Sequence, residues 1–107
     1  MIKTSKLSES EQQALHYLNE VIDPEIGLNV VDLGLIYGIS VDEEKKAIRV
    51  TMTLTTQFCP MGASIVGSVE ETLKDYFPGY EVEVDLVYEP RWNADMISEE
   101  GKAFLGW

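Results

Sequence analysis

The chain contains 107 residues, 45% of them hydrophobic, with 19 acidic residues against 8 basic ones and a formal net charge of −11. This length and apolar content suit a single domain over residues 1–107, which can bury a core without disulfide or metal staples. The negative charge would repel nucleic-acid phosphates, and no apolar run approaches the roughly 18 to 20 residues that span a bilayer. A lone cysteine and an N-terminus without an apolar signal segment favour the cytoplasm.

The first expected helix covers residues 8–22. Ser8 and Glu11 match the S-x-x-E capping box at its start, and Asp23-Pro24 is expected to end it, because the residue before a proline disfavours the α conformation. The apolar residues at helical spacing are Ala14, Leu15, Leu18, Val21 and Ile22. Residues 23–34 are rich in acids and turn formers, so they should form a loop.

A β-hairpin is expected over residues 35–54, because the apolar residues there alternate with a period of two. Leu35, Tyr37, Ile39 and Val41 would share one face, and the second strand would carry Ile48, Val50, Met52 and Leu54 on that face and Arg49, Thr51, Thr53 and Thr55 on the other. The clean alternation predicts a sheet that is covered on one face only.

A second amphipathic helix should begin near Pro60 and stop at Pro78-Gly79. The third strand, residues 80–88, follows as a parallel crossover, and Ser98 should start a short helix over residues 97–105. The predicted fold is therefore α+β: a two-layer α/β sandwich of helix-hairpin-helix-strand order, with a short C-terminal helix and a small mixed sheet covered on one face.

Cys59 carries the sharpest chemical signal. Pro60 at a first-turn position would place Cys59 at or beside the helix N-cap, where unpaired backbone N–H groups and the helix dipole favour a thiolate. A thiolate there is both a better nucleophile and a better metal ligand. The alternative is that Cys59 is a small buried hydrophobe, and its position alone leaves both interpretations open.

Carboxylates and hydroxyls near Cys59 in the sequence are the remaining site candidates. Asp23, Glu25 and Asp32 could bind a metal, act as bases or cap turns, and the turn role is the more common one. Thr55 and Thr56 could donate to the Cys59 sulfur or to a ligand. The role of the tail that carries Trp92 and Trp107 stays open.

Four segments and the start of the tail together resemble the metal-sulfur (iron-sulfur) cluster assembly factor family, which includes SUF-associated and PaaD-like maturation proteins. They are Asp23-Pro24-Glu25-Ile26, Asp32-Leu33-Gly34-Leu35-Ile36-Tyr37, Leu54-Thr55-Thr56-Gln57-Phe58-Cys59-Pro60 and Glu89-Pro90-Arg91-Trp92, with Ile97-Ser98-Glu99-Glu100 beyond. Each motif is weak alone, but their order and spacing are specific. In the tail, Gly101-Lys102 stands where family members tend to have a small residue and then arginine.

The resemblance implies a non-enzymatic accessory role in iron-sulfur cluster assembly or delivery, with Cys59 as the functional residue. The expected partners are iron-sulfur assembly proteins and apo-clients, and a homodimer is open. One chain offers one thiolate, whereas a cluster takes four ligands, so any cluster would be transient and shared with a second chain or client. The alternatives are a thiol-dependent enzyme using Cys59, which lacks an evident histidine partner, and a protein-binding adaptor without metal.

Overall fold

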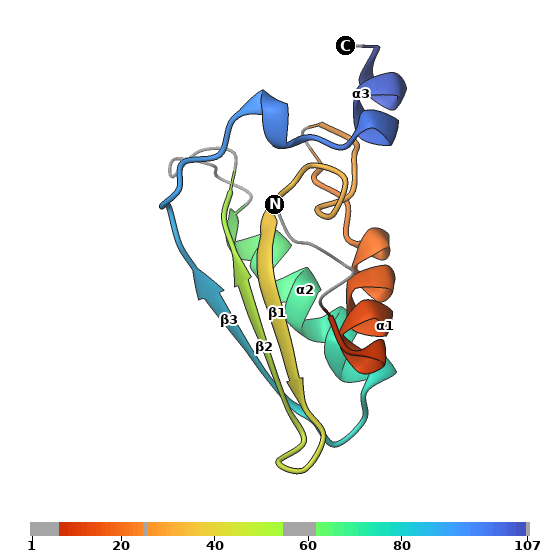
Figure 1. Ribbon diagram of the computed structural model, residues 1–107, viewed down its shortest axis with the longest axis vertical. Coiled ribbons are helices and arrows are strands. Elements are labelled where there is room, and N and C mark those ends of the chain that lie inside the picture. Colours follow the sequence, from red (N-terminus) through yellow and green to blue (C-terminus); the bar gives the residue numbers. More distant parts are fainter. Residues whose placement is uncertain (1–6, 25, 55–61, 107) are drawn as a thin grey trace.

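The computed structural model describes residues 7–24, 26–54 and 62–106 (Figure 1). The elements in chain order are helix α1 (Glu9–Tyr17), strands β1 (Ile36–Asp42) and β2 (Ala47–Met52), helix α2 (Gly62–Tyr76), strand β3 (Glu81–Leu86) and helix α3 (Glu99–Leu105). Short 3-10 turns cover Leu18–Glu20 and Ala94–Met96. The predicted order of helix, hairpin, helix, strand and short C-terminal helix is confirmed.

Helix α1 begins as its capping box predicts. The Ser8 hydroxyl accepts the Glu11 N–H at 3.2 Å, and the Glu11 carboxylate accepts the Ser8 N–H at 3.0 Å. The helix ends earlier than expected, because the chain tightens into a 3-10 turn and becomes extended at Val21. Ile22 therefore leaves the apolar stripe, and its side chain is 48% exposed. Its prediction as a helix-face residue was wrong.

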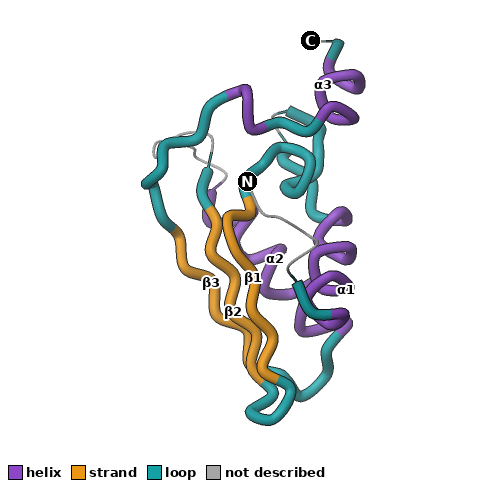
Figure 2. The backbone as a smooth tube through the Cα atoms, viewed as in Figure 1, coloured by secondary structure: helices purple, strands orange, loops and turns teal. Residues whose placement is uncertain are grey.

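The sheet is mixed, as predicted, with the strand order β1-β2-β3 (Figure 2). Strands β1 and β2 form the antiparallel hairpin, and β2 pairs with β3 in parallel after the crossover through α2. In the part of the chain described here, no helix is both long and apolar enough to cross a bilayer.

A register shift between Ile36 and Gly38 changes the predicted face of β1. Ile36 pairs with Met52 and Ile39 with Val50, so the buried positions are three residues apart instead of two. Tyr37 is the extra residue of this β-bulge, and it does not join the core face that its alternation with Ile39 predicted. The bulge matters for the site because it frees the Tyr37 side chain for other contacts.

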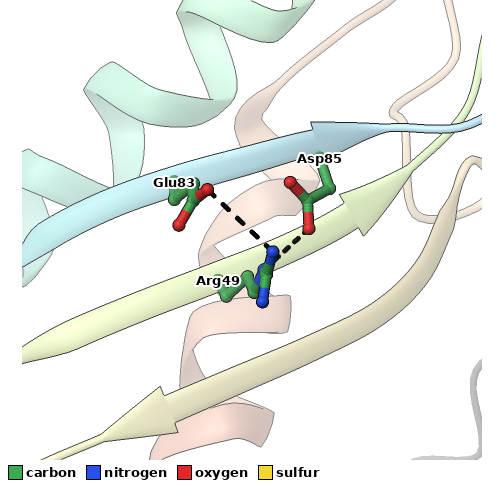
Figure 3. A network of polar contacts seen from close by, with 3 residues as sticks. All are labelled: Arg49, Glu83 and Asp85. Carbon is green, nitrogen blue, oxygen red and sulfur yellow. Dashed lines mark hydrogen bonds and ion pairs between the residues drawn. The ribbon is translucent and has the colours of Figure 1, made fainter.

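Helices α1 and α2 cover one face of the sheet (Figure 1). The core between the layers contains Ala14, Leu15, Leu18, Ile39, Ile48, Val50, Met52, Ile65, Val69 and Leu73. The other face carries exposed charges on β2 and β3, with side-chain exposures of 61% for Arg49 and 69% for Glu83. Arg49 contacts Asp85 at 2.7 Å and Glu83 at 4.0 Å (Figure 3). The domain thus has two layers, one of helices and one of strands, and the outer face of the sheet is polar and open.

Candidate functional site

The loop between α1 and β1 holds the first two acidic motifs and is closed by its own backbone. The Val30 N–H donates to the Val21 carbonyl at 3.0 Å, and Ile22 forms an isolated antiparallel bridge with Asn29. These bonds bring the two ends of the loop together, so residues next to Asp23 lie beside residues next to Asp32. The sequence placed both acids in one loop but did not predict this closure.

Asp23 lies inside that closure, with an exposed fraction of 2%. Its backbone N–H donates to the Leu28 carbonyl at 3.0 Å, and its carbonyl accepts the Gly27 N–H at 2.7 Å. Glu25, the other acid of this motif, lies outside the described residues. A buried carboxylate needs polar partners, and Asp23 does have an interaction beyond these backbone bonds.

Asp32 joins the loop to the C-terminal tail. Its Oδ2 accepts the Asn29 side-chain N–H at 2.7 Å, and its Oδ1 accepts the Ser98 hydroxyl at 3.0 Å. The Asp32 backbone takes part as well, since its N–H donates to Asn29 Oδ1 at 2.8 Å and its carbonyl accepts the Ser98 N–H at 2.8 Å. Each carboxylate oxygen keeps lone-pair capacity beyond these bonds.

Leu33 and Gly34 also contact the tail. The Trp92 indole N–H donates to the Leu33 carbonyl at 2.7 Å. Gly34 has a positive φ of +77°, and a Cβ built there would come within 2.3 Å of the Met96 carbonyl oxygen. A side chain at position 34 is therefore excluded both by the backbone conformation and by the tail. The Asp32-Leu33-Gly34 motif is therefore the part of the loop against which residues 92–98 pack.

Tyr37, which the β-bulge keeps off the core face, links the tail to β1. Its hydroxyl donates to the Pro90 carbonyl at 2.7 Å and lies 3.6 Å from Met96 Sδ. Burial raises the pKa of Tyr37, a hydrogen bond with Thr53 opposes this, and the charge of Glu89 raises the pKa further. Tyr37 therefore remains a neutral hydroxyl donor in the physiological range.

Thr55, Thr56 and Cys59 lie outside the described residues, so the structure does not place them. Their segment follows Leu54 in the chain, shortly after β2 ends at Met52. The Thr53 N–H donates to the Leu35 carbonyl at 2.8 Å, and Thr53 is 1% exposed. The residue directly after β2 is thus hydrogen-bonded to the residue that directly follows the Asp32-Leu33-Gly34 motif.

Within residues 7–24, 26–54 and 62–106, no three His, Cys, Asp or Glu side chains are grouped closely enough to hold a metal. Asp32 instead borders a shallow pocket of about 340 Å³ between α1, the loop and α3. Its lining residues are Gln12, Leu15, His16, Asn19, Val31, Asp32 and Glu100. The described residues supply hydrogen bonding and shape, and a thiolate could come only from Cys59.

Sequence reasoning missed Asn29 and Ser98 as partners of Asp32. An Asn three residues before an Asp is a local signal for a side-chain-capped turn, and Asn29 Oδ1 indeed accepts the Asp32 N–H. Ser98 was predicted only as a helix cap, a role confirmed by the bond from the Gly101 N–H to its hydroxyl at 3.0 Å. Its bond to Asp32 spans 66 residues and has no local signal.

Comparison with known proteins gives consistent matches over most of the chain. Residues 11–86 match the family described as "Iron-sulfur cluster assembly protein". The chain is 43% identical over 86 residues to the "Fe-S protein maturation auxiliary factor SufT" of Staphylococcus aureus, covering 80% of this chain and 97% of that protein. It is 40% identical over 99 residues to the "Fe-S protein maturation auxiliary factor" of Porphyromonas gingivalis, covering 92% and 93%.

Solved structures agree with these sequence matches. The crystal structure of a domain of unknown function from Bacillus anthracis superposes with a TM-score of 0.85 at 38% identity, covering 90% of this chain and 91% of that one. A likeness of this extent and identity supports the described arrangement of helices and strands.

Proposed function

The chain belongs to the iron-sulfur cluster assembly protein family, and from this premise we propose that it is an accessory factor that helps to assemble iron-sulfur clusters or deliver them to client proteins. Cys59 would be a labile ligand for the cluster or its iron. The observation that carries this proposal is the bond of 2.8 Å from Thr53 to Leu35, because it brings the strand leading to Cys59 against the Asp32-Leu33-Gly34 motif.

The number of ligands supports transient handling of the cluster as cargo. The sequence contains one cysteine, and iron-sulfur clusters are usually held by four protein ligands, mostly thiolates. A second chain, a client protein or small thiols would have to supply the rest. The proposed partners are therefore iron-sulfur assembly proteins, apo-clients and, in one arrangement, a second copy of this chain, all acting in the cytoplasm.

The acids and hydroxyls around the two motifs complete the proposed site. Asp23, Glu25, Asp32, Thr55 and Thr56 would surround the Cys59 sulfur and its cargo and supply hydrogen bonds to both. The bonds from Asn29 and Ser98 favour a positioning role for Asp32, since they fix the loop on which it lies. The names of the relatives, which call them auxiliary maturation factors, favour an accessory role over catalysis.

Iron and sulfide analysis of protein purified without oxygen tests the proposal. We expect wild-type protein, reconstituted with iron and sulfide, to bind both and to pass them to an apo-ferredoxin, and Cys59→Ser to lose most of the bound iron and the transfer. Ser68→Ala, which changes an exposed hydroxyl on α2, is the matched control. Equal iron content and equal transfer by wild type and Cys59→Ser would contradict the proposal, provided that circular dichroism shows both variants folded.

A further inference from the structure

In the described part of the chain, the outer edge of β3 has no neighbouring strand. β3 is the last strand in the sheet order, on the side away from α1 (Figure 1). The Glu81 N–H donates to the Lys46 carbonyl at 2.9 Å and the Val87 N–H to the Met52 carbonyl at 2.8 Å. Because backbone groups alternate in direction along a strand, the odd-numbered residues bond to β2 and the even-numbered ones point outward.

The outward-pointing backbone groups belong to Val82, Val84 and Leu86. Among the described residues, no strand pairs with this edge of β3. Six residues of unpaired edge span about 20 Å, which is enough to align an added strand. An exposed edge of this kind is a template for strand addition by another polypeptide.

The side chains of β3 define what could be added. Glu81, Glu83 and Asp85 lie on the open face of the sheet, and Arg49 is the base that contacts two of them, at 4.0 Å and 2.7 Å (Figure 3). The intervening apolar residues lie on the helix-covered face, and exposed apolar surface continues at the end of the strand, where Leu86 and Tyr88 are each 39% exposed. Acidic and apolar side chains therefore alternate along this edge strand.

A second copy of this chain is a poor occupant of the edge. Antiparallel pairing of two β3 strands would place the carboxylates of Glu81, Glu83 and Asp85 opposite one another, and like charges directly across a strand pair are destabilising. The net charge of −11 on each chain adds repulsion at longer range. The same carboxylates would attract a strand with basic side chains. They therefore disfavour pairing of two copies of β3 and favour a basic partner strand.

We propose that the free edge of β3 receives an extended segment of a partner protein in which lysine or arginine alternates with apolar residues. The segment becomes a fourth strand: its basic side chains face Glu81, Glu83 and Asp85, and its apolar side chains continue the layer of Val82 and Val84. The inference rests on the backbone and side chains of β3 alone and does not depend on the role of Cys59.

The test uses the full chain, labelled for NMR, and a capped eight-residue peptide of alternating lysine and valine. We expect chemical-shift changes and slowed amide exchange at Val82, Val84 and Leu86 when the peptide is added. Two further peptides carry N-methyl groups on all valines or on all lysines. Only one set of peptide N–H groups can face β3, so one methylated peptide should bind at least about tenfold more weakly, while the other stays within about twofold.

The methylated set that loses binding also reports strand direction, because an antiparallel strand would direct its valine N–H groups to β3 and a parallel one its lysine N–H groups. Equal binding of both methylated peptides would overturn strand addition and indicate charge attraction only. Because the modification is on the peptide, the folding of the protein is not in question.

Charge selectivity is tested on both sides of the interface. We expect a peptide of alternating glutamate and valine not to bind, and we expect Glu81→Lys with Glu83→Lys to weaken the lysine peptide at least about tenfold. Glu9→Lys with Glu20→Lys makes the same change in net charge at exposed positions in and just after α1, on the opposite side of the sheet from β3, and should change binding by less than about threefold. Equal losses in the two double variants would overturn the proposed location. Cys59→Ser should bind the peptide as wild type does, which separates this proposal from the cluster-ligand proposal.

Discussion

Ser98 and Asp32 are joined twice, once through the Ser98 hydroxyl to Asp32 Oδ1 at 3.0 Å and once through the Ser98 N–H to the Asp32 carbonyl at 2.8 Å. The same hydroxyl accepts the N–H of Gly101 and so starts α3. One side chain thus caps a helix and fixes that helix to the acidic loop. The tail and the candidate site therefore share a structural support.

Ser98→Ala should lower the free energy of unfolding by about 1–2 kcal/mol, because it removes a helix cap and a bond to a carboxylate. Urea denaturation monitored by circular dichroism measures the loss. Ser68→Ala, at an exposed position on α2, should change stability by less than about 0.5 kcal/mol. Equal effects of the two substitutions would show that Ser98 does not hold the tail.

Gly34→Ala should destabilise the protein by more than about 2 kcal/mol, because the new Cβ meets the Met96 carbonyl and the backbone is in the left-handed region. Gly27→Ala is the matched control: φ there is +81°, but a Cβ at that position has no neighbour within 4 Å. It should cost only about 1 kcal/mol of backbone strain. The difference between the two urea midpoints isolates the contact with the tail, and the absence of a difference would contradict that contact.

Stability should fall in acid partly through Glu11. The N–H of Ser8 is the main cause that lowers the pKa of Glu11, the N–H of Val41 and the Ser8 hydroxyl add to it, and burial opposes them. A carboxyl whose pKa is lower in the folded state contributes stability above its unfolded pKa, near 4.3, and that contribution is lost as the pH falls through the lower folded pKa.

Glu11→Gln should therefore reduce the slope of unfolding free energy against pH below about pH 5, measured by urea denaturation between pH 3 and pH 7. Glu9→Gln changes an exposed acid in the same turn and should reduce the slope of unfolding free energy against pH less than Glu11→Gln does. A slope for Glu11→Gln that equals the wild-type slope would show that the cap does not contribute to the acid transition.

Tyr37→Phe should cost about 1 kcal/mol, because it removes the hydroxyl that donates to the Pro90 carbonyl at 2.7 Å. Amide exchange in residues 92–98 should also speed up, since the tail loses one of its anchors. Tyr88→Phe is a control at a partly exposed position. Unchanged exchange in the tail of Tyr37→Phe would contradict an anchoring role.

The elements of this fold were predictable where the signal is local. The capping box of Ser8 and Glu11, the cap at Ser98 and the alternation of β3 from Glu81 to Val84 each lie within a few residues and were confirmed, whereas the predicted burial of Leu86 was not. The bulge at Tyr37 was not predictable, because register depends on the facing strand, and the period of two in the sequence was continuous across it.

The site was only partly predictable for the same reason. Asp32 was identified as a candidate, but its partner Ser98 is 66 residues away, and Trp92 reaches Leu33 across 59. The sequence predicted the loop that contains Asp23, but it did not predict that Asp23 is buried. The predictions for Glu25, Thr55, Thr56 and Cys59 stay predictions, because these residues lie outside the described part of the chain.

The long reach of the tail contacts also sets an order of events during synthesis. The acidic loop is made early, but the bonds that fix Asp32 and Leu33 come from Ser98 and Trp92. Contacts between residues this far apart in the chain form late, because the loop they close is costly in entropy. The tail must leave the ribosome before this end of the sheet is complete, so a nascent chain would bury most of its core before the loop that carries Asp32 is fixed.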